Sequence, residues 1–366
     1  MTDAFIHEVW EPASGFDPAL RASPALWRSL APRRIAPARW SREALFEAAA
    51  RGRPALLSGV RVPVAGASRI GTAPALVRLL EQTFRDPARD ESYVRAQVGP
   101  SRTRRRLPVA ELVRRWSGER QVVSVTDLHI RGTRLERDID TSALSSFNLL
   151  PLGSDDMQRQ EMMTLVVSSR GNVTDSHSDD PDGSNHCFVG RKLWLAWDTF
   201  EGRAAGLQDC SRDLVHDHAR FSLAAFSKLR SACWWTVQAG QTLFLPGRLT
   251  HRVITLDPYI GIGSFYCTPA SVLENLGRWY AHGALWSLDD AAGENAGLVD
   301  EIAASMAARL RRLASQSDRA RRRWGLDFAR AALDGWRQRV PATERRAAAR
   351  HAGFAQVLQA LQAAAA

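Results

Sequence analysis

Cysteine is scarce in this sequence and follows no pattern that would hold a metal or a redox centre. Cys187, Cys210, Cys233 and Cys267 form no Cys-x-x-Cys pair, which argues against a zinc ribbon and a dithiol active site. Isolated cysteines are typical of a reducing compartment, where the thiol acts as a small buried apolar group. A chain of 366 residues can also bury a stable core without disulfides.

Long apolar runs are missing as well. No stretch approaches the roughly 20 residues that cross a bilayer. The first residues, MTDAFIHEVWEP, lack a basic stretch followed by an apolar one, so no secretory signal is expected. The sequence therefore predicts a cytoplasmic protein with no membrane partner.

Positive charge exceeds negative charge, with 49 Lys and Arg against 39 Asp and Glu and a net charge of +10. Two arginine-rich runs, RTRRR at 102–106 and RARRRW at 319–324, could face an acidic partner or a nucleic-acid backbone. No nucleic-acid-binding pattern with interleaved aromatic residues accompanies them. Because alanine and arginine are abundant along the whole chain, we favour a compositional origin for both runs over a nucleic-acid partner.

The first part of the chain combines an extension with short helices. Residues 1–36 are rich in Pro, Ala and Arg and are interpreted as an irregular N-terminal extension. A helix is expected to start at Ser41, with a buried strand after Pro54. The stretches APALVRLLEQTF and PVAELVRRW have the apolar spacing of short amphipathic helices.

Strand-like segments dominate from about 122 to 268. Short runs rich in β-branched and aromatic residues, among them TLVVSS, KLWLAW, TLFLPG and YIGIGSFYC, are separated by Gly, Pro, Asp and Asn. Many short strands broken by turn residues predict a barrel or sandwich of β-strands. We therefore expect the part of the chain from about 122 to 268 to be mainly β.

Residues 269–366 are expected to form a C-terminal helical domain. One broad apolar stripe on its first long helix consists of Leu298, Ile302, Met306, Leu310 and Leu313. This stripe is larger than a solvated appendage needs. We expect part of it to pack on the β domain and the rest to pair with a second copy in a homodimer. The alternative is a monomer whose helices fold back completely.

The acidic stretch TDSHSDDPDG at 174–183 carries a histidine two residues before an aspartate. His177 and Asp179 have the spacing that points two side chains of a strand to the same side. With His251, from the later segment GQTLFLPGRLTHRV, they would complete two histidines and one carboxylate, a ligand set that leaves open positions on an iron ion. Alone, the pair is weak evidence, because solvated acidic loops and half-buried strand histidines are both common.

A lysine strengthens the case for a functional site. Lys192 lies on a strand-like segment, GRKLWLAW, where its ammonium could pair with the distal carboxylate of a dicarboxylate cosubstrate. Thr174, three residues before His177, could donate its hydroxyl to the same carboxylate. The alternative for Lys192 is an ordinary surface lysine of a strand.

Together these segments resemble the JmjC-type Fe(II)/2-oxoglutarate oxygenases. That family includes cupin-like bacterial members and the asparaginyl hydroxylase that acts on hypoxia-inducible factor. Its pattern runs Thr-x-x-His-x-Asp, then a Gly-x-Lys strand, then a strand with Leu and Pro followed by His. The residues that match it are Thr174, His177, Asp179, Lys192, Pro246 and His251. The resemblance covers 37–268 and implies a mainly β fold, the double-stranded β-helix (cupin or jelly-roll barrel), with flanking helices and a C-terminal all-α extension.

The match to the family has departures. Gly183 stands where many members have Asn, and Asn185 is close but out of register. Ser264 precedes an aromatic pair where members often have Asn. These changes leave the metal ligands intact and leave open which of the three residues contacts the cosubstrate.

Other clustered metal-binding residue types are interpreted as loops. The remaining carboxylates of the acidic stretch are expected to face solvent or substrate: Asp175, Asp180 and Asp182. The stretch DCSRDLVHDHARF contains His216 and His218, where an exposed loop is favoured over a second metal site.

The resemblance implies the following activity. Fe(II) would bind to His177, Asp179 and His251, and 2-oxoglutarate would bind the iron and anchor its far carboxylate on Lys192 and Thr174. With O₂, the expected reaction is hydroxylation of a C–H bond, first of all in an amino-acid side chain of a peptide or protein, including a peptide natural product. Demethylation, and hydroxylation of a small molecule or an RNA base, stay open. The alternative hypothesis is that the protein is not an enzyme but a metal-binding cupin that acts as a sensor or scaffold.

Overall fold

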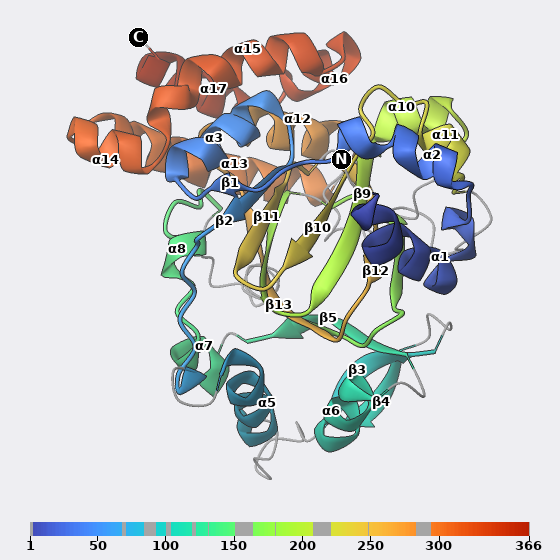
Figure 1. Ribbon diagram of the computed structural model, residues 1–366. Coiled ribbons are helices and arrows are strands. Elements are labelled where there is room, and N and C mark those ends of the chain that lie inside the picture. Colours follow the sequence, from blue (N-terminus) through green and yellow to red (C-terminus); the bar gives the residue numbers. More distant parts are fainter. Residues whose placement is uncertain are drawn as a thin grey trace.

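Two β-sheets form the centre of the protein, and helices cover them (Figure 1). The chain is described here by a computed structural model of its 366 residues. The described residues are 3–67, 71–83, 93–99, 104–118, 122–130, 132–150, 164–179, 181–207, 221–247, 249–282 and 294–365.

The larger sheet has nine strands. In spatial order they are β1 (Ala38–Arg39), β2 (Ala55–Ser58), β11 (Gln241–Leu245), β8 (Asp182–Val189), β13 (Tyr259–Tyr266), β6 (Thr164–Ser168), β5 (Val123–His129), β3 (Tyr93–Val98) and β4 (Arg104–Pro108). All neighbours are antiparallel except β1 and β2.

The smaller sheet has four antiparallel strands. Its order is β10 (Cys233–Gln238), β9 (Arg191–Asp198), β12 (Leu249–Thr255) and β7 (Val173–His177). The expected run of short strands between 122 and 268 is therefore confirmed. Consecutive strands from β6 to β13 switch repeatedly between the two sheets, which brings residues far apart in the sequence to one interior.

The two sheets face each other across an apolar interior. This inner layer takes Trp194, Ala196 and Val253 from the smaller sheet and Val166 and Leu243 from the larger one. Because side chains alternate along a strand, residues two apart share a face. The strand register therefore determines which side chains point between the sheets.

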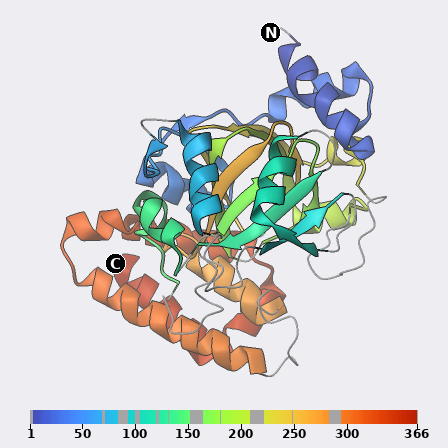
Figure 2. The same cartoon turned by 90° about the horizontal axis from the view of Figure 1, so that it is seen from below.

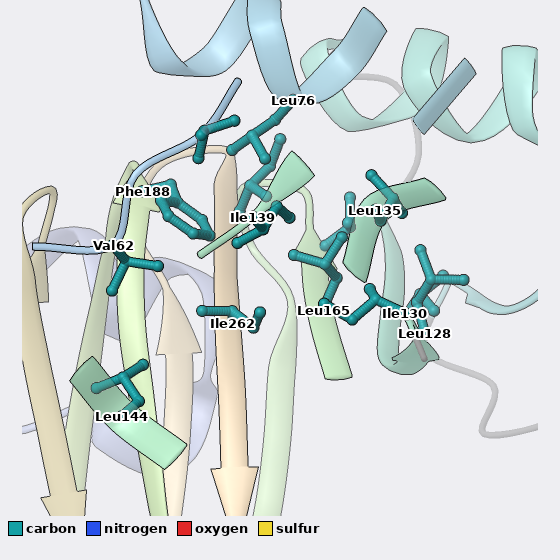
Figure 3. Close-up of a cluster of buried hydrophobic side chains, with 14 of the residues drawn as sticks. Val62, Leu76, Leu128, Ile130, Leu135, Ile139, Leu144, Leu165, Phe188 and Ile262 are labelled. Atoms are coloured by element: carbon teal, nitrogen blue, oxygen red, sulfur yellow. The ribbon is translucent and has the colours of Figure 1, made fainter. Parts of the chain in front are cut away.

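Helices cover the outer face of the larger sheet. Figure 3 shows Phe188, Leu165 and Ile262 of this face packed with Leu76 of α5 (Thr72–Thr83) and Leu135 of α7 (Arg134–Asp138). The same core includes α3 (Arg42–Arg51), α6 (Val109–Ser117) and α8 (Ser142–Ser145). Ser41 caps the N-terminus of α3 by accepting from the backbone N–H of Ala44 at 3.0 Å, which confirms the predicted helix start.

The N-terminal segment covers the outer face of the smaller sheet. It was expected to be irregular, and that prediction is wrong. The segment forms five short helices: η1 (Ile6–Trp10), α1 (Glu11–Phe16), η2 (Pro18–Leu20), α2 (Pro24–Ser29) and η3 (Ala31–Arg33). Trp10, Leu20 and Trp27 pack on Leu195 and Trp234 of the sheet. Two further short helices lie between β9 and β10 in the chain, α10 (Thr199–Ala204) and α11 (Leu223–Phe226), and α11 contributes to the same core. Burial against the sheet, rather than local periodicity, stabilises such short helices.

The C-terminal part is helical, as expected. It comprises α12 (Val272–His282), α13 (Glu294–Ala314), α14 (Asp318–Arg323), η6 (Leu326–Phe328), α15 (Ala329–Arg339), α16 (Ala342–Ala348) and α17 (Ala352–Ala365). Figures 1 and 2 place these helices (orange to red) and the N-terminal helices (blue) on different sides of the central strands.

The apolar stripe of α13 is covered by the chain itself. Ile302, Met306, Leu310 and Leu313 are all buried, in one cluster with Phe354 and other residues of the C-terminal helices. The side chain of Leu298 lies outside the described residues. The described residues of the stripe therefore leave no apolar surface for a second copy to cover. Dimerisation stays a prediction, but the apolar stripe no longer supports it.

The described ranges contain no candidate for a membrane-spanning helix. None of the helices in the described ranges is both long enough and apolar enough to cross a bilayer.

Candidate metal centre

Strand pairing brings His177, Asp179 and His251 together. His177 ends β7, and His251 lies directly opposite it on the neighbouring strand β12. Asp179 follows β7 by two residues. The three predicted ligands thus come from β12, from the end of β7 and from the residues directly after β7, although His251 is far from the other two in the chain.

The three side chains are close enough to hold one ion. Nε2 of His177 lies 3.8 Å from Oδ1 of Asp179, and Nε2 of His251 lies 3.6 Å from Oδ2 of the same carboxylate. The two imidazole rings are 4.1 Å apart, centre to centre. Both atom separations are below about 4.2 Å, twice a usual metal–ligand bond of about 2.1 Å. One ion can therefore contact all three residues, and these three are the only group of this kind among the described residues.

Backbone carbonyls orient both imidazoles. Nδ1 of His177 lies 2.6 Å from the carbonyl oxygen of Asp175, and Nδ1 of His251 lies 3.3 Å from that of Leu249. A carbonyl can only accept, so in each ring Nδ1 carries the proton and donates it. Nε2 then keeps its lone pair and faces Asp179, which is the arrangement that metal-bound histidines commonly show.

Burial keeps His251 neutral. Its side chain is only 2% exposed, and burial, aided by the neighbouring His177, lowers its pKa to about 3. Trp194 stacks on the ring with centres 5.3 Å apart. The side chains of His177 and Asp179 are 27% and 33% exposed, so the centre opens on their side.

The strand register aligns the other two candidates with the ligands. On β12, His251, Val253 and Thr255 share the inner face, and their partners on β9 are Ala196, Trp194 and Lys192. Lys192 thus points to the same interior as His251, four residue pairs further along the ladder.

A β-bulge puts Thr174 on this face as well. Three residues separate Thr174 from His177, which on a regular strand would point them to opposite faces. The register shifts between the His251 and Val253 pairs, so that Thr174 pairs with Val253 while His177 pairs with His251. Thr174 therefore lies between the level of the metal ligands and the level of Lys192.

Lys192 crosses the space between the sheets. It is 3% exposed, its Nζ donates to Oγ of Ser168 at 3.3 Å, and it lies 4.4 Å from the ring centre of Tyr259. Burial lowers the pKa of Lys192 to about 7, and the nearby Cys187 offsets this only in part. The interpretation as a surface lysine is wrong. A buried ammonium whose described contacts are a hydroxyl, a ring and a thiol is suited to receive an anion.

The three residues that depart from the family pattern are now located. On β8, Gly183 and Asn185 both point inward, because they share the parity of the inner-layer residue Cys187. The Tyr259 hydroxyl donates to Oδ1 of Asn185, which presents an amide two residues beyond the expected position. Ser264 pairs with Ser184 on the opposite face, away from the interior.

The expectation for the other carboxylates is wrong where it can be examined. Asp182 is 2% exposed, and its Oδ1 accepts from the backbone N–H of Gly247 at 3.1 Å. Burial raises its pKa to about 6. Asp175 forms an ion pair with Arg252. Asp180, together with His216 and His218, lies outside the described residues.

Sequence reasoning missed two contributors to the site. Trp194 lies in the apolar run after Lys192, where the sequence indicates only an ordinary core residue. Arg252 follows His251 directly and binds two carboxylates on the outer face of the sheet. Neither has a local signal, because both roles depend on partners distant in the sequence.

The fold and the site together define a two-sheet protein with a candidate His–Asp–His metal centre. Neither the comparison with models of known protein families nor the search of curated proteins found a match.

Proposed function

We propose that the protein is a JmjC-type Fe(II)- and 2-oxoglutarate-dependent oxygenase that hydroxylates a C–H bond. The observation that carries this proposal is the inner face of the smaller sheet. It presents two histidines and a carboxylate at one level, and a buried lysine and a threonine hydroxyl further along the same interior.

We also propose that the two sheets are the halves of a double-stranded β-helix. Strands β6, β13, β8 and β11 are neighbours in the larger sheet, and β7, β12, β9 and β10 are neighbours in the smaller one. These eight consecutive strands, divided four and four, support a jelly-roll interpretation. The other strands of the larger sheet then extend that half on both sides.

The donor set fits ferrous iron. Two neutral imidazole nitrogens and one carboxylate suit a non-haem iron that keeps coordination positions open. When bound, Fe(II) would supply the redox chemistry that uses O₂ and 2-oxoglutarate to place an oxygen atom on the substrate. His177, Asp179 and His251 would hold the ion, and the carbonyls of Asp175 and Leu249 keep the two rings in the tautomer that can bind it.

The remaining residues orient the cosubstrate and exclude water. The ammonium of Lys192 would pair with the far carboxylate of 2-oxoglutarate, and the hydroxyl of Thr174 would donate to it. Binding of this anion raises the pKa of Lys192 and stabilises its charged form. The apolar layer around Trp194, Val253 and Leu243 limits water near these groups, which strengthens the electrostatic contacts.

A peptide or protein side chain is the substrate that we propose. The metal centre opens at His177 and Asp179, whose partial exposure gives a large substrate access. The test is mass spectrometry of candidate peptides and of cell extract incubated with the protein. The proposal expects a product heavier by one oxygen atom that requires iron and 2-oxoglutarate. An equal product yield from the His251→Ala variant would contradict it.

A further inference from the structure

A buried arginine joins the back of the metal centre to the N-terminal segment. Arg252 follows the proposed ligand His251 and points to the opposite face of the sheet. Its Nε donates to Oδ2 of Asp17 at 2.6 Å, and its Nη1 donates to Oδ1 of Asp175 at 2.7 Å. The three side chains are 3%, 4% and 9% exposed, respectively.

Each end of this network has a fixed anchor. Asp17 directly precedes η2 and caps its N-terminus, where its Oδ1 also accepts from the backbone N–H of Ala19 at 3.1 Å. The helices around it are buried against the smaller sheet. At the other end, Asp175 is the residue whose backbone carbonyl accepts from Nδ1 of His177. The network therefore connects a segment near the start of the chain to the carbonyl that orients a proposed ligand.

Burial makes this connection stiff. A buried guanidinium is costly unless its donors are matched, and the planar fork of arginine binds two carboxylates only in a defined geometry. Asp175 cannot shift along β7 without losing its contact with Arg252. The carbonyl of the same residue is therefore held where His177 needs it.

We propose that Asp17 is a positioning residue of the metal centre, which acts through Arg252 and Asp175 on the ring orientation of His177. This inference rests on the proposed metal site. It makes the N-terminal segment a working part of that site rather than a cover for the sheet alone. Groups that hold the ligands of a metal commonly change its affinity about 10- to 100-fold when removed.

The test uses Co(II) alone as the probe, on the full chain. Asp17→Asn removes the charge at nearly constant shape. We expect its Kd for Co(II) to rise about 10- to 100-fold and the visible Co(II) spectrum to change, while far-UV circular dichroism of the metal-free protein stays as in the wild type. The matched control is Asp3→Asn, which breaks the exposed pair of Asp3 with Arg28 in the same segment and should change neither reading.

A second variant keeps the test decisive if Asp17→Asn does not fold. Arg252→Lys keeps the charge but lacks the fork that reaches both carboxylates, so it should give the same changes in affinity and spectrum. Co(II) binding by both variants with wild-type affinity and spectrum would overturn the inference. So would a loss of binding that only follows a loss of folded protein, or a failure of both variants to fold, because the network would then be a general stabilising element.

The experiment also separates this inference from the proposed function. If the wild type does not bind Co(II), or if His251→Ala binds it as tightly as the wild type does, the metal site itself is refuted. If both of those results support the metal site, and the Asp17 and Arg252 variants bind Co(II) as the wild type does, only the positioning role is wrong.

Discussion

Replacing Lys192 by methionine separates cosubstrate binding from metal binding. Methionine has a similar length and no charge, so Lys192→Met fills the same space between the sheets. Removing one partner of a buried, hydrogen-bonded charge pair costs about 2–5 kcal/mol, and every 1.4 kcal/mol is about tenfold in affinity. Burial lowers the pKa of Lys192 to about 7, so part of the free protein is uncharged at this position near neutral pH, and the wild-type affinity is lower than that of the fully charged form.

The expected result is therefore a loss of about 30-fold or more in 2-oxoglutarate affinity. Metal affinity should stay nearly unchanged, because Thr255, the partner of Lys192, lies four residues from His251, or about 13 Å along the strand. Isothermal titration with Mn(II) in place of iron measures both constants. Arg191→Met is the matched control, since its side chain pairs with Asp257 and belongs to the other face of β9.

Lys192→Met should not be less stable than the wild type. The folded protein disfavours the charged lysine, so between pH 7 and the usual pKa of 10.5 the unfolded chain binds more protons than the folded one. Wild-type stability contributed by this group therefore rises with pH across that window, and Lys192→Met should remove the rise. At pH 7 its unfolding temperature should equal or exceed that of the wild type. Parallel losses of stability, metal affinity and 2-oxoglutarate affinity would refute the assigned role and make Lys192 a structural residue.

Three further results are expected. Thr174→Val should weaken 2-oxoglutarate binding about fivefold, the effect of roughly 1 kcal/mol for one hydrogen bond, and an unchanged Kd in titration would remove Thr174 from the site. At pH 8, binding of 2-oxoglutarate should take up a proton at Lys192, because an anion raises a pKa that is about 7 in the free protein; calorimetry in buffers with different heats of ionisation measures this uptake, and none should occur with Lys192→Met. Chelating the metal should lower the unfolding temperature of the wild type but not of His251→Ala, since an ion stabilises only a protein that binds it; equal shifts would place the metal elsewhere.

The sequence was informative about the site where spacing alone sets geometry. His177 and Asp179 were proposed as a pair from their separation, and the strand pairing with His251 supplies the third group. The same reasoning could not foresee the β-bulge that brings Thr174 to the face of His177. A bulge depends on how two strands pair, and one strand's sequence does not contain that information.

Burial was harder to predict than secondary structure. The sequence predicts that Asp182 belongs to a solvated acidic loop. The residue is instead buried, and its carboxylate is hydrogen-bonded by Gly247, Ser271 and Asn275, which are distant in the chain. The N-terminal segment reads as irregular, because its helices are too short to show a periodic apolar pattern. Its tryptophans reveal their role only once the outer face of the smaller sheet is there to receive them.

Conversion of 2-oxoglutarate to succinate tests the central claim most directly. The protein is incubated with Fe(II), ¹³C-labelled 2-oxoglutarate and air, and succinate is followed by NMR beside an Asp179→Ala control. The account predicts succinate from the wild type, none above background from the control, and none without O₂. No succinate from a wild-type protein shown to bind Fe(II) would contradict it and would indicate a non-catalytic metal-binding protein instead.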